Sequence, residues 1–87
     1  MTSPKLIAAT HESGYKIHVV FADGVEGTID LESELWGEVF EPLREAERFR
    51  EFRLDMELNT IVWPTGADFA PEFLHERALS KAEVARP

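Results

Sequence analysis

The residue types that could do chemistry in this chain are three histidines, two aspartates near turn glycines, and two tryptophans. Asp23 and Asp68 could resemble a carboxylate pair. However, a short polar side chain in a tight turn usually bonds neighbouring backbone N–H groups. Asp68 also precedes an expected helix start, where a negative charge is favoured. We therefore interpret Asp23 with Gly24 as a structural turn and expect a structural role for the Asp68 carboxylate as well.

The remaining polar residues do not form a catalytic or metal-binding pattern. His11, His18 and His75 lie in different expected elements, and none has a second histidine at metal-ligand spacing. His75-Glu76 does not extend to the His-Glu-x-x-His zinc pattern, the serines lack a nucleophile-elbow context, and the glycines are too scattered for a phosphate loop. We expect surface histidines, no metal, no cofactor and no enzymatic activity.

The tryptophans leave two alternatives open. Either one, if buried, would dominate a core this small. Either one, if exposed beside the Pro64-Thr65-Gly66 turn, would be an interface anchor. The candidate interaction residues are Trp63, Pro64, Gly66, Asp68 and Trp36.

Length and charge limit the classes of function. A chain of 87 residues is one domain, and without cysteine it has neither a disulfide framework nor a thiolate metal site. The net charge is −8, and eleven acidic residues face four arginines between Glu26 and Glu57. That field opposes a phosphate backbone, so we expect no direct nucleic-acid binding and, instead, a basic protein partner. The alternative is a solvated acidic face that keeps a small domain soluble.

The ends of the chain predict neither export nor membrane insertion. The start Met-Thr-Ser-Pro-Lys has no apolar segment behind it, and no apolar run approaches the roughly 20 residues that span a bilayer. We expect a cytoplasmic protein with one domain over residues 1–79. Residues 80–87 have no periodicity and are predicted to form a flexible tail.

Period-2 alternation predicts a hairpin in the first third of the chain. A first strand is expected over Lys5–Thr10, ended by a turn at residues 11–14. The next strand starts at Tyr15, and a third follows Asp23-Gly24. A two-residue loop would mix apolar and polar residues on one face. A three-residue loop, Ala22-Asp23-Gly24, keeps the apolar residues together and places Gly24 at the left-handed position of a G1 bulge.

A helical period follows. Residues 32–36 are expected to form a short turn of helix that ends at Gly37, and Pro42 suits a first helical position. An apolar stripe then predicts a helix of about three turns. Its members are Leu43, Ala46, Phe49 and Phe52.

The last third contains a second hairpin and a helix. Strands are expected over Arg53–Glu57 and Thr60–Trp63, with Asn59 at a left-handed turn position. Pro64 ends the second strand because it cannot donate to a ladder, and the chain turns through Gly66. The final helix is predicted from Pro71 to about Leu79. Phe69 and Leu74 occupy the positions of a hydrophobic staple.

Several short motifs resemble those of a small bacterial family that is known only as a domain of unknown function. They are Phe21-Ala22-Asp23-Gly24, Asp30-Leu31, Val39-Phe40-Glu41-Pro42-Leu43, Phe49 and the late Trp63-Pro64-Thr65-Gly66-Ala67-Asp68. The resemblance covers about residues 4–79, and Trp-Pro-x-Gly-x-Asp is its specific part. The position after Pro64 is often asparagine in that family and is Thr65 here.

The resemblance implies an α+β domain in the order β-β-β-α-β-β-α, with antiparallel hairpins packed against two helices. Members of the family occur alone, fused to a helix-turn-helix domain, or encoded beside a second small domain in a toxin–antitoxin-like arrangement. It supplies no catalytic residues.

Two functional hypotheses follow. The first is a non-catalytic interaction or regulatory module, the antitoxin-like partner of a small basic protein. The second is a small-molecule sensor with Trp63, Asp68 and Tyr15 around a shallow site. Homodimerisation is compatible with both, because a three-stranded sheet leaves edges to cover.

Overall fold

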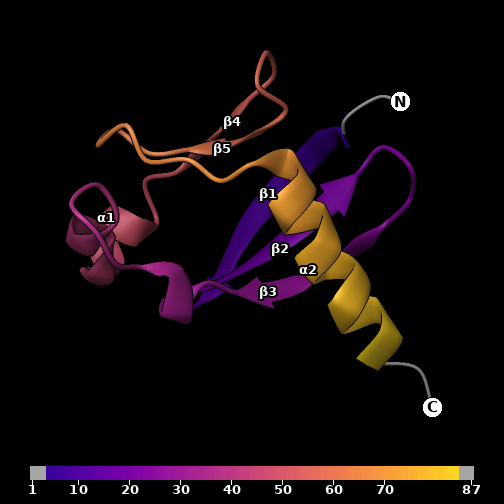
Figure 1. Cartoon of the computed structure of the whole chain (residues 1–87), viewed down its shortest axis with the longest axis horizontal. Helices are drawn as coiled ribbons and strands as arrows, with labels where there is room; N and C mark the ends of the chain where they lie inside the picture. Colours follow the sequence, from indigo (N-terminus) through magenta and orange to yellow (C-terminus); the bar gives the residue numbers. More distant parts are fainter. Residues whose placement is uncertain (1–3, 85–87) are drawn as a thin grey trace.

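The computed structural model describes residues 4–84, with side chains through residue 79. Its elements are β1 (Leu6–Ser13), β2 (Lys16–Phe21), β3 (Glu26–Asp30), η1 (Glu32–Glu34), η2 (Glu41–Arg44), α1 (Ala46–Phe49), β4 (Arg53–Asp55), β5 (Thr60–Val62) and α2 (Pro71–Val84). β1, β2 and β3 form an antiparallel sheet in that order, and β4 pairs with β5. Helix α2 packs across β2 and β3, whereas β4 lies beside β1 (Figure 1). This is the predicted α+β order.

The β2–β3 hairpin has the predicted register and the predicted bulge. Val19 lies opposite Gly27. At the turn, the Phe21 N–H donates to the Val25 carbonyl at 2.8 Å, and the Gly24 N–H donates to the Phe21 carbonyl at 3.0 Å. Gly24 has a φ of 92°, in the left-handed region that a side chain resists. We call residues 21–25 the first turn.

The chain repeats this turn after β5. The Trp63 N–H donates to the Ala67 carbonyl at 2.9 Å, the Gly66 N–H donates to the Trp63 carbonyl at 2.9 Å, and Gly66 has a φ of 93°. Val62 and Asp68 form an antiparallel bridge just outside it. We call residues 63–67 the second turn, and it leads the chain towards α2.

The first strand differs from its prediction. β1 continues to Ser13, which pairs with Lys16, so the expected turn at residues 11–14 is mostly strand. The connection is only Gly14 and Tyr15. Gly14 supplies the positive φ, 49°, that a two-residue connection requires, and the strand therefore runs further than its composition suggests.

The predicted three-turn helix is wrong. The chain forms a 3₁₀ turn, η2, and a single α turn, α1, separated by Glu45 with an extended ψ of 124°. Leu43 and Phe49 are both fully buried, and residues six positions apart do not share a helical face. The break at Glu45 lets both side chains enter the core, and it leaves Ala46 of the expected stripe exposed.

We call residues 35–49 the connecting segment; its only helices and strands are the short turns η2 and α1. Four of its carbonyl oxygens accept hydrogen bonds from side chains, three of which come from outside the segment. The Arg44 side chain donates to the Leu35 carbonyl, and the Thr65 side chain donates to the Val39 carbonyl. The Tyr15 hydroxyl donates to the Arg44 carbonyl, and the Trp63 indole donates to the Phe49 carbonyl. These bonds satisfy backbone groups that a helix would otherwise pair internally.

The second hairpin and the final helix form where they were predicted, but with other bounds: β4 ends at Asp55 rather than Glu57, and β5 ends at Val62 rather than Trp63. Asn59 takes a left-handed φ of 58° in the β4–β5 loop, and Pro71 is the first residue of α2. Phe69 and Leu74 are buried, as a hydrophobic staple requires. Helix α2 continues to Val84 rather than ending near Leu79, so it includes part of the predicted tail. Residues 85–87 of that tail lie outside the described residues.

Candidate functional site

Trp63 belongs to the core. Its side chain is 3% exposed, and its indole N–H donates to the Phe49 carbonyl at 2.8 Å. Its ring contacts those of Phe49 and Phe69, with centroids 5.7 and 5.8 Å away. Of the two alternatives for this tryptophan, burial is the one the structure adopts, so its side chain is not a surface anchor.

Trp36 has the opposite environment. Its side chain is 70% exposed, the largest exposed fraction among the large apolar residues described. The backbone beneath it is nevertheless fixed, because the Trp36 N–H donates to the Glu34 carbonyl at 3.0 Å and Gly37 turns the chain with a φ of 92°. Trp36 therefore offers a large aromatic surface from a well-anchored position.

Trp36 forms one side of a groove with a volume of about 350 Å³. The groove is lined by Glu34, Trp36, Phe40, Asp68, Phe69 and Ala70. Two of the predicted interaction residues, Trp36 and Asp68, thus meet here although they are far apart in sequence. The others do not line the groove: Pro64 and Gly66 are exposed in the second turn, and Trp63 lies in the core behind Phe69.

The apolar part of this groove is a row of aromatic rings. The ring centroids of Phe40 and Phe69 are 4.9 Å apart, and the Phe69 ring stacks on that of Phe73 with centroids 5.4 Å apart. The hydroxyl of Thr65 donates to the Val39 carbonyl at 3.3 Å, which ties the second turn to the segment that carries Phe40. These contacts give the groove a packed floor.

Two carboxylates border the groove, and they differ in what they contact. Glu34 accepts a hydrogen bond of 2.7 Å from Arg77 of α2. The Arg77 guanidinium also lies over the Phe73 ring, 4.7 Å from its centroid. The Asp68 carboxylate is exposed, and no side chain in the described part of the chain hydrogen-bonds to it. One acidic group of the groove is therefore compensated within the chain, and the other faces solvent. The structural role expected for the Asp68 carboxylate is wrong, because it bonds no backbone N–H of the described residues.

Asp23 and Gly24 have the predicted structural role, with one addition. The Val25 N–H donates to the Asp23 carboxylate at 3.0 Å, and this bond, followed by the contact with His75, lowers the pKa of Asp23 from its ordinary value. His75 of α2 reaches the other carboxylate oxygen at 2.8 Å and is only 19% exposed. The prediction of a surface histidine is wrong for His75, because it fastens α2 to the first turn.

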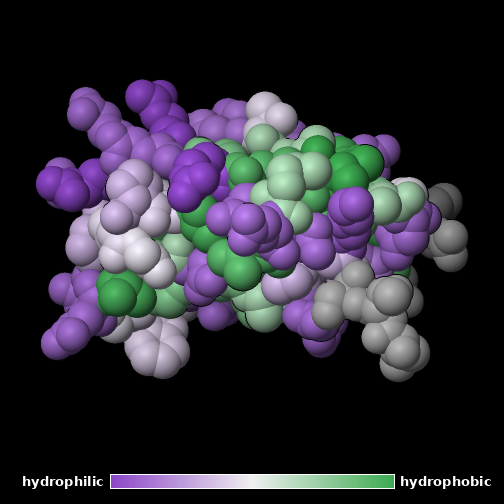
Figure 2. All heavy atoms as spheres, turned by 90° about the horizontal axis from the view of Figure 1, so that it is seen from above, coloured by the Kyte–Doolittle hydropathy of each residue, from purple (hydrophilic) through white to green (hydrophobic). Residues whose placement is uncertain are grey.

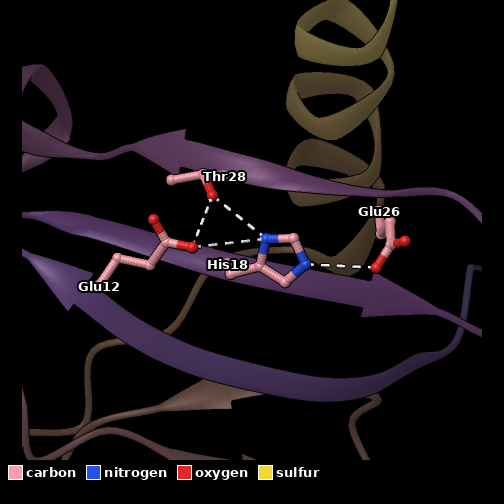
Figure 3. A network of polar contacts seen from close by, with 4 residues as sticks. All are labelled: Glu12, His18, Glu26 and Thr28. Atoms are coloured by element: carbon pink, nitrogen blue, oxygen red, sulfur yellow. Dashed lines mark hydrogen bonds and ion pairs between the residues drawn. The ribbon is translucent and has the colours of Figure 1, made fainter.

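His18 joins a polar network across the open face of the sheet (Figure 3). Its Nδ1 lies 3.1 Å from the Thr28 hydroxyl, and its Nε2 lies 3.3 Å from the Glu26 carboxylate. Thr28 donates its proton to Glu12 at 3.0 Å. A carboxylate only accepts hydrogen bonds, so the Thr28 hydroxyl donates to Glu12 and the His18 Nε2 donates to Glu26.

This network has the composition of a hydroxyl–imidazole–carboxylate relay but not its geometry. A relay needs an unprotonated ring nitrogen that accepts the hydroxyl proton, whereas Thr28 gives its proton to Glu12. The interaction is therefore a cross-strand contact that stabilises the sheet. His11 bonds the Gly14 carbonyl at 2.9 Å, which is likewise structural.

Neither a metal site nor a membrane span is visible in the part of the chain that the structure describes. No group of three or more metal-ligating side chains gathers there. No helix among those residues is long and apolar enough to cross a bilayer.

Sequence reasoning missed most of the groove. In the sequence, Phe40 belongs to a family motif just before Pro42 and Phe69 to a hydrophobic staple, and neither position indicates a surface role. Tyr15, expected beside Trp63 and Asp68, instead packs against Phe49 with ring centroids 5.3 Å apart and donates to the Arg44 carbonyl. The short helical turn predicted over residues 32–36 is present as η1, followed by the turn at Gly37. The sequence left open whether Trp36 is buried or exposed, and the structure exposes it.

A family model described as "Protein of unknown function (DUF2442)" matches residues 6–80. The chain belongs to this family. Comparison of this DUF2442 member with curated proteins and with solved structures finds no significant match. The match confirms the resemblance to a family of unknown function. It covers both turns, every strand and the groove residues.

Proposed function

We propose that this chain is a non-catalytic, cytoplasmic interaction module that binds another protein through the Trp36 groove. The single observation that carries the proposal is the indole of Trp36, which is 70% exposed and lies beside a groove with aromatic lining residues. Large aromatic side chains next to a pocket are the residues that most often dominate binding energy at interfaces. Val39, a further exposed apolar residue of the connecting segment, is 47% exposed.

The charge around the groove supports a basic partner. Asp68 lies in the groove, and a second hollow that includes Gly37 is lined by three glutamates and one arginine, Glu38, Glu41, Glu45 and Arg48. With a net charge of −8, the molecule attracts a positively charged protein at long range, and that attraction weakens as salt rises. An antitoxin-like role, in which the partner is a small basic protein, agrees with this charge and with the toxin–antitoxin-like setting that the sequence resemblance implies.

The test is affinity capture from the native cell lysate at low and high salt, with identification by mass spectrometry. Three tagged baits are compared: the wild-type protein, the Trp36→Ala variant, and the Met56→Ala variant as a matched control. Met56 is also an exposed apolar residue, 61% exposed, but it lies in the β4–β5 loop. Such a control is needed because apolar side chains reach the surface in several places among hydrophilic ones (Figure 2). We expect one basic protein on the wild type and on Met56→Ala, less of it at high salt, and none on Trp36→Ala.

Two outcomes would contradict the proposal. One is a wild-type bait that emerges alone at both salt concentrations. The other is a partner that Trp36→Ala retains as well as the wild type does. Urea unfolding of Trp36→Ala should match the wild type, because an exposed side chain contributes little to stability, and this shows that lost capture is not lost folding.

A small-molecule sensor near the Trp63–Asp68 turn is the second candidate. The groove volume of about 350 Å³ is what favours it, since ligand pockets begin near that size. Trp63 and Tyr15 do not line the groove, so Asp68 is the residue that such a ligand would contact. The check is a thermal-shift screen of metabolites, in which a true ligand loses its effect on Asp68→Ala.

A further inference from the structure

We propose that the Trp36 groove accepts an arginine side chain from the partner, with the guanidinium on the indole of Trp36 and paired with the Asp68 carboxylate. The inference rests on the proposed function and specifies the chemistry of what binds there. Arginine is the side chain that fits, because the groove combines an exposed aromatic face with a carboxylate that has no partner in the described part of the chain.

The chain already contains an arginine held in this manner. Arg77 lies over the Phe73 ring, 4.7 Å from its centroid, while its guanidinium nitrogen is 2.7 Å from Glu34. Phe73 stacks on Phe69, which is itself a groove residue. An aromatic ring and a carboxylate therefore hold one guanidinium at the α2 end of the aromatic row. Trp36 and Asp68 provide the same two components in the groove, where no side chain of the described chain fills them.

The chemistry favours arginine over other side chains. A guanidinium is planar, stacks on an aromatic face and presents paired N–H donors that match a carboxylate. It is also more weakly hydrated than an ammonium, so it loses less on leaving water. Tryptophan is the best aromatic partner for a cation. A purely apolar side chain would fill the groove but would leave Asp68 uncompensated at the edge of the contact.

The experiment uses the full chain labelled with ¹⁵N and three probes: N-acetyl-arginine amide, N-acetyl-lysine amide and N-acetyl-citrulline amide. Citrulline has the shape of arginine without its charge. The two indole N–H signals act as internal reporters, because Trp36 is exposed and Trp63 is buried and bonded to Phe49. We expect the arginine probe to shift the Trp36 indole and Asp68 amide signals, the lysine probe to bind more weakly, and the citrulline probe to leave both signals unmoved.

Matched variants separate a specific pair from general charge. Asp68→Asn and Glu57→Gln remove the same amount of charge, but Glu57 lies in the exposed β4–β5 loop. We expect Asp68→Asn to weaken binding of the arginine probe by about threefold or more, the scale of an exposed ion pair, and Glu57→Gln to leave it unchanged. Equal effects of the two variants would overturn the inference, as would a citrulline probe that binds as well as arginine.

The outcome is separable from that of the proposed function. If lysate capture depends on Trp36 but the groove shows no preference for arginine, the interaction module stands and the arginine inference is wrong. If the groove prefers arginine while the bait captures no protein, the protein-partner function is wrong and the groove is a site for a free guanidinium compound.

Discussion

The first and second turns close with the same pair of backbone hydrogen bonds around glycines whose φ angles are 92° and 93°. Each begins with a buried aromatic residue, Phe21 or Trp63. At the third position, the Asp23 carboxylate accepts from the backbone N–H two residues later at 3.0 Å, and the Thr65 hydroxyl accepts the equivalent bond at 3.4 Å. The two turns thus share their backbone and the local role of the third side chain.

They differ in what that third side chain reaches. Asp23 extends to His75 and holds α2 against the sheet, whereas Thr65 donates to the Val39 carbonyl and holds the connecting segment beside the groove. The comparison shows that local sequence specifies the shape of a turn, while one side chain decides which part of the molecule the turn secures. Three predictions test how similar the first and second turns are in their contributions to stability.

The largest expected effect is at the aromatic residue of each turn. Trp63→Ala should lower the free energy of unfolding by about 3–5 kcal/mol, because it leaves a large cavity and removes the donor to Phe49. Phe21→Ala should cost less, since its ring makes no hydrogen bond. Urea unfolding followed by circular dichroism measures both. Trp63→Phe keeps a ring without the donor, and a Trp63→Ala cost below that of Phe21→Ala would contradict the order.

A smaller and equal effect is expected at the two glycines. Gly24→Ala and Gly66→Ala should each cost about 1–2 kcal/mol, because an L-residue is strained at a left-handed φ. Nothing lies within 4 Å of the added Cβ at either glycine, so backbone strain and not a steric clash is the cost in the folded state. D-alanine at the same positions, introduced by chemical synthesis, should restore stability. Clearly unequal costs would show that the turns differ in their backbone after all.

The smallest effect concerns pH. The pKa of Asp23 is lowered in the folded protein, first by the Val25 N–H and then by His75. Its contribution to stability is therefore present above the ordinary aspartate pKa and is lost as the pH falls through the lowered value. Asp23→Asn should flatten the loss of stability below about pH 4, whereas Thr65→Ala should lower stability by the same amount across that range. Unfolding midpoints measured against pH check both, and an unchanged acid slope in Asp23→Asn would contradict the prediction.

Sequence reasoning succeeded where neighbouring residues decide the structure. Alternation fixed the register of β2 on β3, and the left-handed positions of Gly24 and Asn59 followed from turn chemistry. It failed for residues 42–53, because an apolar spacing of three is compatible with both a continuous helix and a broken one. The choice depended on whether Leu43 and Phe49 could both reach the core, which is a property of the whole fold.

The groove could be predicted only in part. Trp36 and Asp68 were both singled out as interaction residues, but nothing local indicates that they meet or that Trp63 stays inside. Their approach depends on the turn at Gly37, the break at Glu45 and the bond from Thr65 to Val39. The turn at Gly37 was predicted, but the Glu45 break depends on what the core can accommodate and the Thr65–Val39 bond joins distant parts of the chain, and periodicity reports neither.

The carbonyl groups of the connecting segment accept hydrogen bonds from Tyr15, Trp63 and Thr65, which belong to parts of the chain that fold elsewhere. The segment therefore orders together with the core rather than ahead of it. Trp36 lies on this segment, so a binding-competent groove exists only in the fully folded chain. A partner that binds there would shift the folding equilibrium towards the native state by mass action. Such a protein would be protected from proteolysis most when its partner is abundant.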